Sequence, residues 1–296
     1  MQVPGQTGQA PSREDNGVFV FKKQVDEVQL HATVVDEKHR LVTNLSRADF
    51  RVFEDGIPQQ IKSFRREDIP VALGIVIDNS GSMREKRPAV NQAAINLVRA
   101  SNPNDEVFIV NFNDESFLDQ DFTNQVPLLK EALDRIEARG GTALYDAVVA
   151  AADHLKKNAR LDKKVILVIT DGEDNASRET LEQAVRLLQA ENGPTVYTIG
   201  LLGEERQRRA RRALQAMAEQ TGGVSFFPKD LAEVDSITQQ VAHDIRNQYT
   251  IGYAPTTPQE RGGYRTVKVE AHAPGYKHLN VRTRSGYYAG QERASR

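Results

Sequence analysis

The sequence predicts an α/β protein in which a doubly wound, mostly parallel sheet is inserted into a discontinuous β-sandwich. Residues 71–77 and 164–170 are mostly apolar runs followed by helical patterns, which is typical of parallel strands buried on both faces. Residues 18–68 and 249–290 instead contain strand patterns with almost no helical ones. We therefore assign 69–248 to the α/β domain, 18–68 with 249–290 to the sandwich, and 1–17 and 291–296 to polar tails.

The composition excludes several classes of function. The chain has 296 residues, 39% of them hydrophobic, a formal net charge of -2 and no cysteine. A nearly balanced charge argues against nucleic acid as the partner, and the lack of cysteine excludes thiol chemistry and cysteine-based zinc sites. No apolar run approaches the ~20 residues that cross a bilayer. The polar start at 1–17 suits a secreted or periplasmic protein, although a cytosolic protein with a loose N-terminus would have the same composition.

The N-terminal region is predicted to be β-rich. Apolar runs or alternating patterns indicate strands at 18–21 and 28–34, and a single helical turn fits 46–49. Asp55-Gly56 is a strong turn signal between apolar segments at 50–53 and 60–64, which predicts a hairpin formed by those two segments. In the C-terminal region we expect strands at 249–253, 264–271 and 279–288.

Strands and helices alternate between these two regions, which predicts a Rossmann-like sheet with right-handed crossovers. Expected strands are 71–77, 106–112, 116–122, 164–170, 195–201 and 224–227. Expected helices are 85–100, 126–136, the segment after Thr142, 179–190, 204–220 and 231–246, with Thr142 as the cap of its helix. The first sheet strand begins, and the last helix ends, at the edge opposite the loops that follow the strands. Both flanks therefore leave the α/β domain together and can join into one sandwich, which neither could form alone.

Oxygen-bearing side chains follow the two apolar strands. The first strand runs into Asp78, Ser80 and Ser82, and the second ends before Asp171. Thr142 follows a pair of glycines and precedes a helix. Because the carboxyl ends of parallel strands meet at one edge of the sheet, these side chains should lie together and offer the oxygen ligands that hard cations prefer. The alternative is that each side chain only caps a loop or a helix.

This Asp-x-Ser-x-Ser, Thr, Asp set resembles the metal-ion-dependent adhesion site of the von Willebrand factor type A (VWA) domain. The resemblance covers roughly residues 70–248, and all five positions are filled. It implies direct binding of Mg²⁺ or Mn²⁺ by the three hydroxyls, with the two carboxylates nearby, often through water. It also implies a protein ligand whose Asp or Glu completes the metal coordination. The metal residues would be Asp78, Ser80, Ser82, Thr142 and Asp171.

The flanks extend the resemblance. The segments LSRADFRVFEDG before the α/β domain and YTIGYAP with SGYYA after it are similar to a VWA-related family abundant in Acidobacteria. Membership of that family would imply an exported bacterial protein. The placement of one domain inside another is similar in principle to the insertion of such domains in integrin β chains.

We expect a binding module for adhesion or assembly rather than an enzyme. Two alternatives stay open: a metal-assisted hydrolase that uses Asp78, and a structural component whose metal only stabilises the loops. The chain contains neither a phosphate-binding Gly-x-x-x-x-Gly-Lys loop nor a Gly-x-Gly-x-x-Gly dinucleotide motif, and no base is placed beside the site. The sequence indicates no particular oligomeric state.

Charged segments flank the expected site. Acidic residues expected at its rim are Asp114, Glu115 and Glu173. A basic segment in the helix at 204–220 is interpreted as the exposed face of an amphipathic helix, with an anionic partner as the alternative. Its cations are Arg206, Arg208, Arg209, Arg211 and Arg212.

Overall fold

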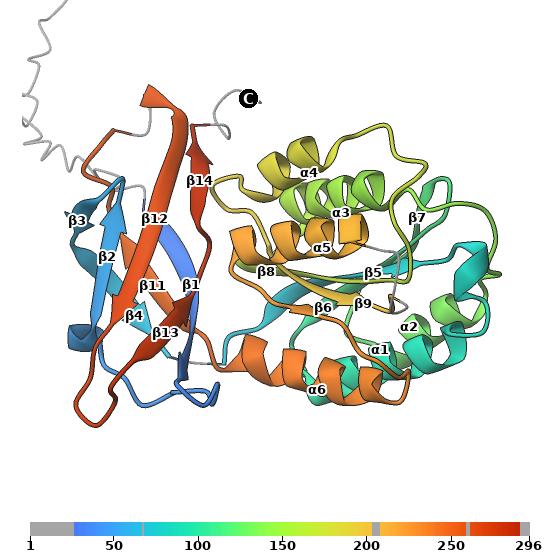
Figure 1. The fold of residues 1–296 in the computed structure, drawn as a ribbon, viewed down its shortest axis with the longest axis horizontal. Helices are drawn as coiled ribbons and strands as arrows, with labels where there is room; N and C mark the ends of the chain where they lie inside the picture. Colours follow the sequence, from blue (N-terminus) through green and yellow to red (C-terminus); the bar gives the residue numbers. More distant parts are fainter. Residues whose placement is uncertain (1–26, 67, 203–207, 259–260, 291–296) are drawn as a thin grey trace, which may run out of the picture.

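The computed structural model describes residues 27–66, 68–202, 208–258 and 261–290, which form a β-sandwich beside an α/β unit (Figure 1). The α/β unit is built on a six-stranded sheet in which only the pairing between β6 and β7 is antiparallel. From one edge to the other its strands are β10 (Ser225–Phe226), β9 (Thr195–Gly200), β8 (Lys163–Thr170), β5 (Val71–Asp78), β6 (Glu106–Phe112) and β7 (Ser116–Thr123).

Helices cover both faces of this sheet (Figure 1). One face packs on α1 (Arg87–Ala100), α2 (Val126–Asp134) and α6 (Glu233–Arg246), and the other on α3 (Leu144–Asn158), α4 (Leu181–Leu188) and α5 (Arg208–Thr221). Along β5, Leu73, Ile75 and Ile77 belong to the first core and Val76 to the second. None of the helices in the described segments is both long and apolar enough to cross a membrane.

A glycine allows close packing in the middle of β5. A Cβ atom on Gly74 would lie 2.4 Å from Cζ of Phe108, which belongs to the neighbouring strand β6. Real Cβ atoms do not approach other atoms so closely, so a side chain at this position would displace the phenylalanine ring. The strand that leads to the candidate site is therefore fixed in place by packing on both faces.

The sandwich consists of two four-stranded sheets whose neighbouring strands are all antiparallel. The first sheet has the order β13 (Leu279–Arg282), β1 (Val28–Asp36), β11 (Tyr249–Tyr253) and β4 (Ile61–Arg65). The second has the order β14 (Gly286–Ala289), β12 (Gly263–Ala271), β2 (Phe50–Glu54) and β3 (Ile57–Gln59). Strands from the two ends of the chain thus pair with each other in both sheets, and the predicted fold class is confirmed.

Residues from both ends of the chain also fill the interior of the sandwich. The rings of Phe50, Phe64 and Tyr249 lie 5.0–5.7 Å apart, centroid to centroid. A buried carboxylate, Glu54, accepts hydrogen bonds from the hydroxyls of Tyr253 and Tyr287, at 2.7 and 2.8 Å, and pairs with Arg265. Because this carboxylate has both a cation and two donors, its burial leaves no oxygen without a partner.

Two strand predictions were wrong in detail. The partner of β2 in the hairpin is β3, not the segment 60–64, because the chain crosses at Gln60 and enters the other sheet as β4. The segment 279–288 is not one strand but two, since β13 and β14 lie in different sheets. Between them Arg284 turns towards the α/β unit and donates hydrogen bonds to the carbonyls of Glu191 and Gly193. The strand predicted at 18–21 and the start of the helix at 204–220 lie outside the described residues.

Candidate metal centre

Two neighbouring parallel strands place the carboxylates of the candidate site. Ile77 of β5 lies directly opposite Ile169 of β8 in the parallel pairing of the two strands. Asp78 and the Thr170-Asp171 pair, which follow them, therefore lie side by side at the carboxyl ends of the strands. The chain then turns away from β5 through a short 3₁₀ helix, Gly81–Met83. This turn returns the serines after Asp78 towards β8.

A chain of hydrogen bonds joins four of the five predicted residues. Asp78 accepts hydrogen bonds from the Thr170 hydroxyl at 2.6 Å and from the Ser80 backbone N–H at 2.7 Å. The hydroxyls of Ser80 and Ser82 lie 3.1 Å apart, and Ser82 donates to Oδ1 of Asp171 at 2.8 Å. The structure therefore brings two carboxylates and two hydroxyls into one connected group.

Thr142 lies at the same edge but does not cap its helix. The helix α3 begins at Leu144, and its N-cap residue, Ala143, forms no side-chain cap. The N–H groups of its first turn donate to Asp174 and Ser177. Instead, the Thr142 hydroxyl and the Asp78 carboxylate both border Gly172: they lie 3.3 and 4.0 Å from the position of a Cβ on that glycine. The prediction of a helix cap is wrong, and the hydroxyl is directed to the other site residues.

Hydrogen bonds to the backbone of the Thr142 loop hold this loop in place. Asn175 accepts a hydrogen bond from the Thr142 N–H at 2.9 Å, and its own N–H donates to the Thr142 carbonyl at 3.0 Å. On the other side, Asp114 accepts from the Gly141 N–H at 2.9 Å. Gly140 has φ of 76°, a conformation that favours glycine. These partners come from two other loops, so local sequence spacing could not reveal Asn175.

The site residues differ in their exposure to solvent. Asp78 is fully buried, and Ser80, Thr142 and Asp171 are at most 4% exposed, whereas Ser82 lies at the surface. Burial raises the pKa of the Asp78 carboxyl, and the nearby Asp171 carboxylate raises it further. The ammonium group of Lys86 forms an ion pair with Asp171, a contact that the sequence did not suggest.

The donor set decides which chemistry the site can support. All five predicted residues offer oxygen atoms, and hard divalent cations such as Mg²⁺ prefer oxygen. Within the described ranges, no three His, Cys, Asp or Glu side chains cluster in a way that could hold a metal, so a cation here would depend on the hydroxyls. An open cleft of about 420 Å³ lies over the site. It is lined by Ser82, Lys86, Thr142, Asp171, Gly172 and Glu173, among others.

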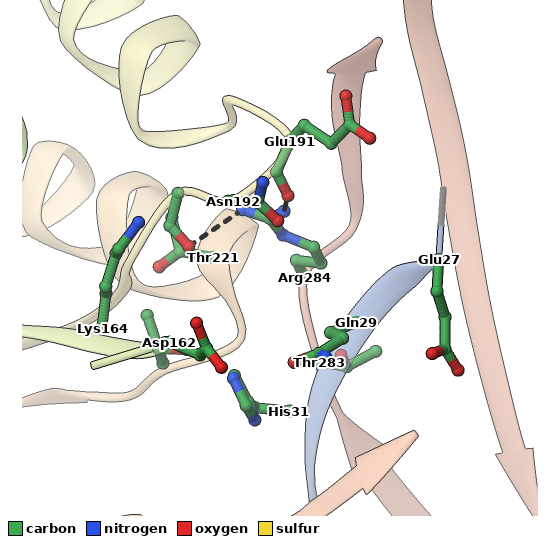
Figure 2. Close-up of a pocket in the computed structure, with 12 residues that line it drawn as sticks. Glu27, Gln29, His31, Asp162, Lys164, Glu191, Asn192, Thr221, Thr283 and Arg284 are labelled. Carbon is green, nitrogen blue, oxygen red and sulfur yellow. Dashed lines mark hydrogen bonds between the residues drawn. The ribbon is translucent and has the colours of Figure 1, made fainter. Parts of the chain in front are cut away.

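A separate cavity of about 230 Å³ lies between the sandwich and the α/β unit (Figure 2). His31 of β1 and Arg284 line it from the sandwich, and Asp162 and Lys164 line it from the α/β unit. The pKa of His31 is lowered to about 3, mainly because burial disfavours its charged form and also because of the charges of Lys163 and Arg284. Arg284 donates to backbone carbonyls of the α/β unit, so these polar groups join the two units.

Comparisons with known proteins agree with the fold. Residues 73–173 match the family model described as the von Willebrand factor type A domain. An uncharacterized protein from Synechocystis is 25% identical over 163 residues, and calcium-activated chloride channel regulator 1 from Sus scrofa is 28% identical over 168 residues. Each match covers 54% of this chain but only 38% and 17% of the relative, so the chain spans well under half the length of these curated relatives.

Several solved structures share the fold of part or most of this chain at low sequence identity. A von Willebrand factor type A protein from Catenulispora acidiphila, 14% identical, superposes with a TM-score of 0.51 over 91% of this chain and 74% of its own. A single-residue mutant of the PilB minor pilin from Streptococcus sanguinis, 13% identical, gives 0.52 over 60% of this chain and 62% of its own. The vWF domain of the pilus tip protein Mfa5 from Porphyromonas gingivalis, 15% identical, gives 0.50 over 60% and 97%.

Proposed function

Because the chain contains a von Willebrand factor type A domain, we propose that it is a metal-dependent protein-binding module for adhesion or assembly. In this proposal Mg²⁺ or Mn²⁺ is held by Asp78, Ser80, Ser82, Thr142 and Asp171, and an Asp or Glu of a protein ligand binds there. The observation that carries it is the hydrogen-bonded chain from Asp78 through the two serines to Asp171, beneath an open cleft.

The chemistry of the residues explains why an acidic ligand would be favoured. A bound divalent cation would supply concentrated positive charge at the floor of the cleft. The three hydroxyls are neutral and leave the ion electron-poor, while the two carboxylates retain it without fully quenching its charge. A carboxylate from outside can then complete the coordination of the ion. The cleft above the site gives such a side chain a path to it.

The fold's occurrence elsewhere supports a role in adhesion or assembly. Two of the similar structures are a minor pilin and the vWF domain of a pilus tip protein. We extend this to the present chain as part of the proposal, together with an exported location, secreted or periplasmic.

The hydrolase alternative is disfavoured by the surroundings of Asp78. A carboxylate that acts as nucleophile needs an accessible oxygen, but this one is fully buried and both of its oxygens accept hydrogen bonds. We therefore include in the proposal that the protein is not an enzyme. A screen with phosphate ester, peptide and glycoside substrates should show no turnover that Asp78→Asn abolishes.

Metal binding to the purified protein is the direct test. Titration with Mn²⁺, followed by calorimetry or by the signal of the free ion, should give one site per chain. Ser80→Ala or Thr142→Ala should weaken the Mn²⁺ affinity at least tenfold. Ser101→Ala is a matched control. That hydroxyl donates to the Leu97 carbonyl at the C-terminal end of α1, which lies at the amino ends of the strands, away from the site. Equal Mn²⁺ affinity in all four proteins would overturn the proposed site.

Ligand capture separates a binding site from a purely stabilising metal. A partner isolated from the native extract should bind in Mg²⁺ and dissociate in EDTA, while circular dichroism shows that the fold persists. Changing the partner's critical Asp or Glu to Asn or Gln should abolish binding. Binding unaffected by EDTA would place the partner elsewhere on the surface.

A further inference from the structure

A cluster of four arginines lies beside the candidate metal centre. They occupy the first described turns of α5, and all four are exposed: Arg208, Arg209, Arg211 and Arg212. We refer to them as the arginine cluster. Two contacts fix its position at the edge of the sheet that carries the metal centre. The Arg209 guanidinium lies 3.6 Å from the Glu173 carboxylate, and Arg211 stacks on the ring of Phe227, 3.9 Å from its centroid.

Both contact partners belong to that edge. Glu173 follows Asp171 by two residues and lines the same cleft. Phe227 directly follows β10, which is parallel to β9. The residue after β9, Leu201, lines the cleft. Phe227 therefore lies at the same ends of the strands as the cleft. The cluster and the metal centre are therefore neighbouring parts of one surface.

The cluster concentrates positive charge on one exposed surface. Four cations lie within five positions of α5, and the first described turn contains no acidic residue. A local excess of one sign of charge raises the concentration of oppositely charged groups near the surface. The arginine cluster therefore favours an anionic ligand.

The existing contact of Arg209 is easily exchanged. Its side chain is 87% exposed, and that of Glu173 is 39% exposed. Exposed ion pairs at such distances contribute at most about 1 kcal/mol. A guanidinium can instead form two parallel hydrogen bonds with an incoming carboxylate, which is a stronger arrangement. A ligand carboxylate can thus take the place of Glu173.

We propose that the arginine cluster is a second contact for the protein ligand, which must then be an acidic segment rather than a single acidic side chain. This inference rests on the proposed function, since it places the first carboxylate at the metal centre. The Cα atoms of Asp171 and Glu173 are at most about 7.6 Å apart, because consecutive Cα atoms are separated by 3.8 Å. An extended ligand advances about 3.3 Å per residue. A second Asp or Glu about three to five residues from the metal-bound one would reach Arg209 or Arg212.

Synthetic peptides provide the test with the full chain. One fluorescein-labelled peptide carries a single Asp in a Gly/Ser background, and a second carries two further Asp residues three and four positions away. In Mg²⁺ the triacidic peptide should bind about tenfold more tightly than the monoacidic one. Arg209→Gln with Arg212→Gln should remove that difference and leave the monoacidic affinity within twofold. Lys156→Gln with Arg160→Gln is the matched control, because those exposed cations lie at the opposite edge of the sheet.

Each outcome has a distinct meaning. Equal binding of both peptides that still requires Mg²⁺ would overturn the role of the arginine cluster and leave the metal centre intact. Binding that persists in EDTA would contradict the proposed function itself. Failure of both peptides to bind at millimolar concentration would overturn the acidic-segment ligand. Binding of single-stranded DNA that the double glutamine variant loses, without a preference between the peptides, would assign the cluster to nucleic acid and overturn this inference.

Discussion

Arg282 in β13 donates hydrogen bonds to both carboxylate oxygens of Asp244 in α6, with nitrogen–oxygen distances of 2.9 and 3.1 Å. The hydroxyl of Tyr197, in β9, donates a third bond to the same carboxylate at 3.0 Å. Because α6 is the last helix of the α/β unit and β13 belongs to the sandwich, this ion pair connects the two units. Only two residues separate α6 from β11, so the pair reinforces a short covalent junction.

Removing the arginine should destabilise the whole chain. In Arg282→Met the Asp244 carboxylate, only 9% exposed, loses its counter-charge. We expect the free energy of unfolding in guanidinium chloride to fall by about 2–3 kcal/mol, since an uncompensated buried charge is costly. Lys157→Met removes an exposed pair with Asp153 and should change stability by less than about 0.5 kcal/mol. Equal losses in the two variants would show that the pair does not connect the units energetically.

Acid should weaken the protein through His31. Its pKa is lowered to about 3 in the folded chain, from an ordinary value of 6.5, because the half-buried ring is partly desolvated and lies near two cations. Between these values the unfolded chain binds a proton that the folded chain does not, so the free energy of unfolding falls as the pH falls from 6.5 towards 3. Above pH 6.5 the imidazole is neutral in both the folded and the unfolded chain, so His31 does not lower the free energy of unfolding there.

The His31→Gln variant isolates this effect from other titrating groups. Denaturant unfolding of both proteins at pH 7 and pH 4.5 should show a smaller pH-dependent loss in the variant, by about 2 kcal/mol. Parallel pH dependences in the two proteins would exclude His31 as the source.

Lys86 should compete with a divalent cation for Asp171. Its ammonium group pairs with the carboxylate that we assign to the metal. Lys86→Met keeps the length of the side chain and removes the charge, so Mn²⁺ affinity should increase by about three- to tenfold, as expected when a nearby like charge is removed. Lys130→Met, an exposed position on α2, is the control. Weaker Mn²⁺ binding in Lys86→Met would mean that the lysine positions Asp171 instead.

Much of the α/β fold follows from local sequence patterns. The apolar run at 71–77 can be satisfied only by a strand covered on both faces, and its polar continuation at Asp78 marks the carboxyl end. Since parallel strands end at one edge, the proximity of Asp78 and Asp171 was also predictable.

The remaining features depend on contacts between distant segments. In the sequence Lys86 is one of four consecutive charged residues, 84–87, and only the fold shows that it pairs with Asp171. The Gly-Gly-Thr pattern suggested a helix cap, whereas the fold directs Thr142 towards Gly172. The break between β13 and β14 is set by Arg284, whose partners are carbonyls of the α/β unit. None of these partners is near in sequence, so no periodicity could reveal them.

Deletion of the C-terminal strands should unfold those of the N-terminal region. Among the described strands β1 pairs with β11 and β13, and β4 pairs with β11 alone. A chain that ends at Gln248 therefore lacks every described strand that pairs with β1 or β4. It also removes half of the apolar residues that cover Phe50 and its neighbours. Isolated strands are not stable in water, so hydrogen exchange should show unprotected amides at 28–36 and 61–65.

Exchange in the α/β unit makes this prediction specific. The strands β5 and β8 are buried between two helical layers and should keep slow exchange in the shortened chain, even though Asp244 loses Arg282. A chain that lacks only 291–296 is the control and should exchange like the full-length protein. Slow exchange at 28–36 after deletion of 249–296 would mean that the N-terminal strands are stable without their C-terminal partners. It would then follow that the two β-rich ends are independent, and that the pairing of β1 with β11 and β13 contributes little to folding.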